Sequence, residues 1–345
     1  MQISQTSLPS SRTARRNASC LALCLTAVIF LAACSHKAAN PPESAAAQPA
    51  APAAPPPPPK SEPVQAEMRN VLFHFSDTAG AHIETLTGEL LATGDNLMPV
   101  MDDKSSFSVR IKSAHISVSP WAMAQVLNAY AFAKADSPVK DVTITIKDNQ
   151  IHLKGKLHSK GDLPFETVGT PSTTPDGRIR MHSEKVKAFH LPVKGMMNLF
   201  GIELAGMLGG KIPGIEADKD DLILDLSKLL PAPHFQGAVT EVHLETDQIV
   251  MTFGSGERAA PLDKGNYIAF HGGKIRMGKL VMNDSDLMVL DLDPADPLDW
   301  SQEHYRDQLV AGYSKITPAF GLRAYVKDFA KLSRVPKNGV TRAAQ

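Results

Sequence analysis

Short runs of alternating apolar and polar residues, separated by turn residues, dominate the central part of this chain of 345 residues. The sequence FSVRIKSAHISV at 107–118 alternates in this way, and so does VTITIK at 142–147. Successive side chains of a strand point to opposite faces of a sheet, so the pattern predicts strands with one apolar and one polar face. Such strands are typical of antiparallel sheets that have one face in water.

Turn residues within this pattern predict three hairpins. They are 142–147 with 150–157 turning at Asp148-Asn149, 238–253 turning at Thr246-Asp247, and 266–282 turning at Gly272-Gly273. In the last of these, both glycines can take the positive φ that a tight hairpin turn requires. The segments RIRMHSEKVKAF at 178–189 and LMVLDL at 287–292 predict two further strands.

Two longer helices are expected to interrupt the strands. Ser119-Pro120 is a favourable N-cap and first-turn pair, and it opens the segment WAMAQVLNAYAFAKA. The second helix, VKGMMNLFGIELAGML at 193–208, precedes Gly209-Gly210, which predicts its end. Two shorter helical segments are predicted at 227–232 and 303–313.

The segment 193–208 has a wider apolar side than a surface helix needs. It carries three methionines, whose flexible side chains suit surfaces that repack around variable partners. Glu203 lies within the apolar side, and a buried carboxylate must be paired or neutral. Two interpretations stay open: a buried core helix, or one wall of a groove for an apolar ligand.

The N-terminal residues 1–33 have the features of a secretory signal peptide. Arg12, Arg15 and Arg16 form a positive region, and the apolar run that follows is too short for a stable membrane span. The run ends in LAAC, which resembles the lipobox of bacterial lipoproteins. This resemblance implies cleavage before Cys34 and lipidation of its sulfur. The alternative is an ordinary signal peptide in which Cys34 has no role.

Residues 34–66 are predicted to be a disordered tether after the lipidated cysteine. The segment is rich in proline and alanine and has almost no large apolar residue, so it cannot bury enough surface to fold. We expect one α+β domain at 67–335 and a disordered tail at 336–345. Loss of residues 1–33 removes three arginines from a chain with 36 basic and 36 acidic residues, which leaves a formal charge of −3. No basic stripe indicates nucleic-acid binding.

Catalytic and metal-binding motifs are weak in this sequence. All three cysteines lie at or before position 34, so the mature chain has no disulfide framework and no cysteine nucleophile. GKIRMGKL at 273–280 has Leu280 where a phosphate-binding loop needs Ser or Thr. The segment 284–299 is rich in aspartate, and Asp291, Asp293 and Asp296 are weak candidates for a cation site, although turn formation and solvation are the preferred explanation. No catalytic residue and no cofactor are predicted.

Three stretches together resemble bacterial lipid-binding proteins of the tubular lipid-binding (TULIP-like) type. They are AHISVSPWAMAQVLN, VTITIKDNQIHLKGKL and the region from LPVKGMMNLFGIELAGML to DDLILDLSKLL, and the resemblance covers about residues 107–253. It implies a long curved antiparallel sheet that wraps one or two amphipathic helices and leaves an apolar groove. The region after residue 265 has no counterpart in that pattern.

These observations predict a lipoprotein of the bacterial cell envelope, anchored to a membrane through lipid and most consistent with the periplasmic face of the outer membrane. The expected ligand is a lipid or another apolar small molecule, bound or shuttled in the groove. Protein partners are not predicted. The expected groove residues are Trp121, Met123, Val126, Leu127, Met196, Met197, Phe200, Leu204 and Met207. The alternatives are a ligand-free envelope scaffold and a hydrolase of envelope glycans with two facing carboxylates.

Overall fold

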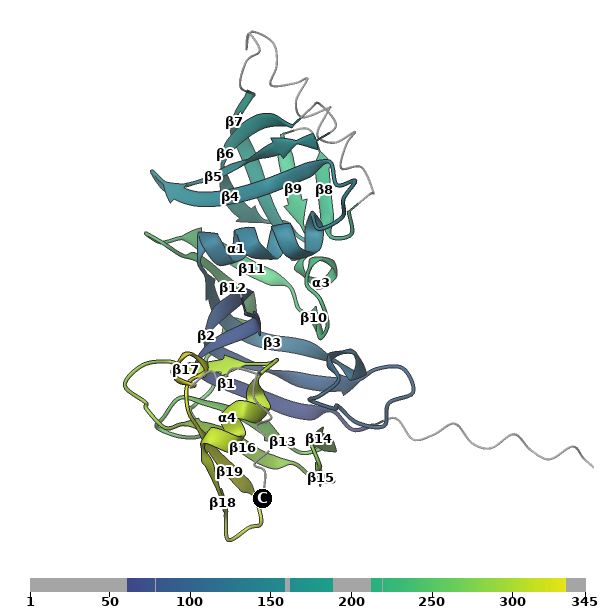
Figure 1. Cartoon of the computed structure of the whole chain (residues 1–345), viewed down its shortest axis with the longest axis vertical. Coiled ribbons are helices and arrows are strands. Elements are labelled where there is room, and N and C mark those ends of the chain that lie inside the picture. The colour runs from purple at the N-terminus through teal and green to yellow at the C-terminus, as the bar shows by residue number, and fades with distance from the viewer. Residues whose placement is uncertain (1–60, 78, 159–161, 189–211, 219, 333–345) are drawn as a thin grey trace, which may run out of the picture. The chain divides into compact units, whose positions relative to one another are not determined.

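The computed structural model describes residues 61–77, 79–158, 162–188, 212–218 and 220–332. This part of the chain is mostly β-strand with a few short helices, and its strands form open sheets (Figure 1). The expected β-rich, largely antiparallel fold is therefore present. The predicted signal peptide, Cys34, most of the tether, the helix 193–208 and the tail 336–345 lie outside the described residues.

The larger sheet has eleven strands. Its main path runs β11 (Val239–Leu244), β12 (Ile249–Gly254), β3 (Phe107–Val118), β2 (Ala79–Ala92), β1 (Val64–Ser76), β13 (Tyr267–His271), β16 (Asp286–Asp291), β19 (Leu322–Val326) and β18 (Tyr313–Ile316). Two further strands join this path in parallel: β10 (His234–Gln236) pairs with β3, and β17 (Leu298–Ser301) pairs with β1.

A second sheet has six strands, and a third is a two-stranded hairpin. The six-stranded sheet runs β4 (Val139–Lys147), β5 (Gln150–Leu157), β6 (Leu163–Thr173), β7 (Ile179–Ala188), β9 (Asp221–Leu224) and β8 (Ile215–Asp218). The hairpin consists of β14 (Ile275–Met277) and β15 (Leu280–Met282). Most buried apolar residues of the two larger sheets belong to one hydrophobic core, and a smaller second cluster lies on β13 and β16.

The helical segments of the described residues are short. They are η1 (Lys104–Ser106), α1 (Pro120–Val126), η2 (Leu127–Ala131), α3 (Leu226–Leu229), α4 (Tyr305–Ala311) and η4 (Phe329–Lys331). The predicted start of α1 is confirmed, because the Ser119 side chain accepts a hydrogen bond from the backbone N–H of Ala122 and Pro120 occupies the first turn. The helix ends sooner than the sequence predicts, since Leu127–Ala131 winds more widely as a π-helical turn.

β1 begins inside the range predicted to be tether. Val64 has no exposed surface and Ala66 is buried, because both side chains pack in the main hydrophobic core, and this part of β1 pairs with β2 on one side and β13 on the other. The folded domain therefore starts before residue 67. Composition did not reveal this start, since the apolar residues at 64 and 66 directly follow a proline-rich segment.

Two of the three predicted hairpins are confirmed. β4 and β5 pair across Asp148 and Asn149, which both have positive φ (53° and 58°) as a primed hairpin turn requires. β11 and β12 pair with each other as well.

The hairpin predicted at Gly272-Gly273 is wrong. Both glycines do have positive φ, but β13 pairs with β1 and β16 instead of β14. Backbone hydrogen bonds from Gly272 N–H to the Ser285 carbonyl and from Ser285 N–H to the Gly273 carbonyl join the two ends of the segment that contains β14 and β15. The chain turns after Met277, between β14 and β15. Residues 274–284 therefore form an insertion between β13 and β16, which pair with each other.

Candidate functional site

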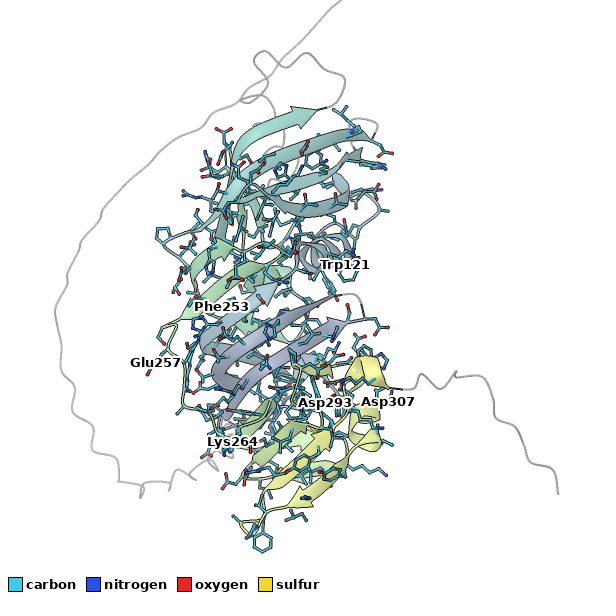
Figure 2. The ribbon with its side chains drawn as sticks, turned by 90° about the vertical axis from the view of Figure 1, so that its left-hand side faces the viewer. Trp121, Phe253, Glu257, Lys264, Asp293 and Asp307 are labelled. Atoms are coloured by element: carbon cyan, nitrogen blue, oxygen red, sulfur yellow. The ribbon has the colours of Figure 1, made fainter. Side chains whose placement is uncertain are left out.

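An apolar cavity lies against one face of the larger sheet. Alternation along the strands selects its wall: on β3, Phe107, Val109 and Ile111 line the cavity, whereas Arg110 is exposed. The lining residues are Ala66, Met68, Phe73, Phe75, Gly80, Ala81, Ile83, Leu86, Leu90, Met101, Phe107, Val109, Ile111, Ile116, Val118, Met123, Val126, Leu226, Leu230, Pro233, Phe235, Met251, Phe253, Ile268, Phe270, Trp300 and Gln302. Figure 2 labels one of them, Phe253 on β12.

The cavity has room for a hydrocarbon chain. Its volume is about 110 Å³. A single water needs roughly 10–15 Å³. The space therefore exceeds a packing defect by several-fold, and it suits a ligand of several carbon atoms.

Among the described residues, no charged side chain lines this cavity. Gln302 is the lining residue with a polar side-chain amide, and its Nε2 donates a hydrogen bond to the backbone carbonyl of Met101 at 3.1 Å. The side-chain N–H group of Gln302 therefore points to the backbone of the protein. A wall of this kind recognises a ligand by apolar burial and shape.

Three further segments contribute to the wall of the cavity. α1 contributes Met123 and Val126, the segment that contains α3 and β10 contributes Phe235 among others, and β17 contributes Trp300. Aromatic contacts join these parts: the Phe75 and Phe235 rings meet edge to face with centroids 5.9 Å apart. The wall is therefore assembled from segments far apart in the sequence.

The sequence-predicted groove residues on α1 and at the start of η2 have different locations. Met123 and Val126 line the cavity, and Leu127 is buried in the core without being among its lining residues. Trp121 is 59% exposed, and it points away from the core on α1 (Figure 2). The other five predicted groove residues, Met196, Met197, Phe200, Leu204 and Met207, lie outside the described residues.

The sequence-based site prediction missed the contribution of β1 and β2. These strands supply Phe73, Phe75, Ile83 and Leu90, among other lining residues. A signal was present, because LFHFS at 72–76 and AHIETLTGELL at 81–91 both alternate apolar and polar residues.

A polar depression adjoins the apolar cavity and shares Phe75 with it. It measures about 600 Å³ and is lined by Phe75, Asp102, Asp103, Lys104, Ser105, Tyr130, Pro231, Ala232 and Glu303. The Nζ of Lys104 lies 2.8 Å from Oε1 of Glu303 and 3.4 Å from the Phe75 carbonyl oxygen. Burial by itself would raise the pKa of Asp102, but hydrogen bonds from Tyr305 and Arg306 bring that pKa below its ordinary value.

The weak candidates for a cation site are engaged by protein groups. Asp291 is buried and accepts hydrogen bonds from Asn266 Nδ2 and from the Asp293 backbone N–H, and burial raises its pKa. The Nζ of Lys331 lies 2.9 Å from Asp293, which Figure 2 labels, and 3.3 Å from Asp296. The lysine ammonium therefore supplies the positive charge among these carboxylates.

A separate group of possible metal ligands lies near the polar depression. Ligand atoms of Asp77, Glu303 and His304 lie within 4.8 Å of one another. Glu303 pairs with Lys104, and His304 Nε2 lies 3.2 Å from Asp77 Oδ1. These protein contacts account for the grouping, so it provides no independent indication of a metal.

Comparison with known protein families, curated proteins and solved structures found no match. Among the described residues, no helix is long and apolar enough to cross a membrane. The geometry of the cavity and its surroundings is therefore the basis for any functional conclusion.

Proposed function

We propose that this protein binds a lipid or another apolar molecule in the cavity between the larger sheet and α1, and that it does so while anchored to a membrane of the bacterial envelope. The observation that carries the proposal is the apolar lining of the cavity, in which the amide of Gln302 is directed at the protein backbone. The proposal includes the arrangement seen in tubular lipid-binding proteins, with a sheet curved around the ligand and α1 against it.

Energetics support an acyl chain as the ligand. Each methylene group that leaves water for an apolar space gains about 0.8 kcal/mol. Large apolar cavities without polar groups are poorly hydrated and accept apolar molecules. A polar metabolite would lose its hydrogen bonds to water in this space and gain none from the wall. Chain length and shape would therefore govern affinity inside the cavity.

The anchor proposed at Cys34 would place the domain beside its source of ligand. A proline-rich tether rises about 3.1 Å per residue in its extended helical form, so the tether would allow the cavity to reach the bilayer and to leave it. This arrangement suits a protein that takes up a lipid from one membrane and holds or passes on its apolar part.

The binding proposal is tested on the full chain, expressed in a bacterium and extracted under mild conditions. We expect native mass spectrometry to show an added mass that disappears after solvent extraction, and the extract to contain an acylated compound. A domain that carries no added mass and binds no apolar probe such as 1,6-diphenylhexatriene would contradict the proposal. A ligand-free envelope scaffold would then be the better interpretation.

The anchor is tested separately. Cys34→Ser removes the sulfur that the lipid would modify, so we expect metabolic labelling with a fatty acid to mark the wild type and not the variant. The variant should also lose its membrane association, or keep its uncleaved leader. If the Cys34→Ser variant were still labelled, the fatty acid would be attached at another residue, and the proposed anchor at Cys34 would be wrong.

A further inference from the structure

The apolar cavity and the polar depression adjoin each other. At three places the chain passes from the wall of the cavity to the wall of the depression in consecutive residues. These are Met101 to Asp102, Pro233 to Ala232, and Gln302 to Glu303. Phe75 belongs to both walls. A molecule whose tail enters the cavity therefore has a polar surface directly beside it.

A polar headgroup is not expected to follow its tail into the cavity, because the described part of the wall offers it no charged partner. The headgroup would remain in the depression, where solvent and charged side chains are available. Since this argument concerns the ligand of the same cavity, it rests on the proposed function.

Two of the four charged residues that line the depression, Asp102 and Asp103, accept hydrogen bonds from other groups of the protein. Asp102 accepts hydrogen bonds from Tyr305 Oη, Arg306 Nε and the Gly278 backbone N–H. Asp103 caps η1 by accepting hydrogen bonds from the backbone N–H and the hydroxyl of Ser105. These contacts hold the loop between β2 and β3 in place.

Lys104 and Glu303 remain as the charged groups that can respond to a ligand. Their side chains are 32% and 42% exposed, and their ion pair is 2.8 Å long. Because both partners are partly solvated, separating them costs little. An amphiphile with only one charge would engage one partner and leave the other without its counter-charge. A headgroup with both an anion and a cation would engage both.

We propose that the ligand is an amphiphile with a zwitterionic headgroup, whose anionic group lies at Lys104 and whose cationic group lies at Glu303 while its acyl chain fills the cavity. The polar depression is then the entrance through which the chain enters. The chemistry indicated is that of a phosphate ester carrying an ammonium group.

The experiment compares three probes on the intact domain and its tether. They are lysophosphatidylethanolamine, which is zwitterionic; lysophosphatidylglycerol with the same acyl chain, which is anionic; and diphenylhexatriene, which has no headgroup. We expect wild type to prefer the zwitterionic probe by about 2- to 5-fold, the range of a partly exposed charge pair. Glu303→Gln should abolish this preference, and Lys104→Gln should weaken both phospholipid probes. Diphenylhexatriene should bind all variants equally.

Lys264→Gln is the matched control, because Lys264 is an exposed lysine in the loop between β12 and β13 (Figure 2). It should leave all three affinities at the wild-type value, and melting curves should show that every variant is folded. Equal binding of the two phospholipid probes by wild type, or an unchanged preference in Glu303→Gln, would overturn the headgroup assignment while the cavity still binds diphenylhexatriene. Failure of wild type to bind any of the three probes would instead overturn the proposed function, and this inference with it.

Discussion

Asn70 donates a hydrogen bond from its Nδ2 to Oδ1 of Asn266 at 2.8 Å, at the point where β1 changes its neighbour. Residues 65–69 of β1 pair with β13, whereas residues 71–74 pair in parallel with β17. The Asn70 backbone has a positive φ of 50°, and its Oδ1 lies 2.8 Å from Nε2 of His82. This change of neighbour places β17, and with it Trp300, against the cavity.

We predict that Asn70→Gly destabilises the domain by about 1–3 kcal/mol, because Asn266 and His82 each lose a hydrogen-bond partner in a partly buried site. Asn70→Ala should cost roughly 1 kcal/mol more, since alanine is strained at positive φ. Urea unfolding of the two variants separates these effects. A glycine variant as stable as wild type would show that the side-chain network contributes nothing.

A second prediction uses two buried alanines on different surfaces of the larger sheet. Ala81 on β2 lines the cavity, whereas Ala269 on β13 is fully buried in a separate cluster with Tyr267 and Met288. Ala81→Phe should change the melting temperature little and block the binding of diphenylhexatriene. Ala269→Phe should lower the free energy of unfolding by about 1–3 kcal/mol or more, because the larger side chain overpacks a filled site. Equal destabilisation by both changes would mean that the space beside Ala81 cannot accept added atoms.

A third prediction concerns acid stability. Glu89 on β2 lies 2.7 Å from the Nζ of Lys112, and the hydrogen bond from Lys112 is the main cause that holds its pKa below the ordinary value. A depressed folded-state pKa gives stability that is present above the unfolded-state pKa and is lost as the pH falls through the folded-state pKa.

Glu89→Gln should therefore lower the free energy of unfolding at pH 7 by no more than about 1 kcal/mol, because Lys112 is half exposed. The difference from wild type should shrink to zero at pH values well below the ordinary glutamate pKa. Unfolding in urea across this range checks the prediction, with the exposed Glu245→Gln as control. A difference that is independent of pH would assign the effect to packing instead of charge.

A fourth prediction locates the start of the domain. A chain that begins at residue 61 should fold, whereas a chain that begins at residue 68 should be clearly less stable. The shorter chain lacks Val64 and Ala66, and burial of a valine side chain is worth about 1.5–3 kcal/mol. Thermal melting and limited proteolysis of the two chains provide the comparison. Identical melting curves would favour the boundary drawn from composition.

Part of the cavity wall could be inferred from the sequence. Ser119, Pro120 and the apolar residues that follow them predict α1, and Met123 and Val126 of this helix line the cavity. The polar depression could not be inferred in this way. Lys104 and Glu303 are 199 residues apart in the chain, and neither belongs to a motif. Their pairing depends on β17, whose neighbour is β1 near the beginning of the domain.

By itself, the sequence determined some of the strands, among them β3, β4 and β5, and the local turns of β4–β5 and β11–β12, because alternation and turn chemistry act between residues close in the chain. It did not determine the neighbours of β13. The two glycines at 272–273 permit a hairpin, but the edges of β1 and β16 pair with β13 instead. Only the tertiary structure decided this pairing and the cavity, since both depend on which distant edges and apolar faces meet, and a local pattern specifies a strand's faces without specifying its partners.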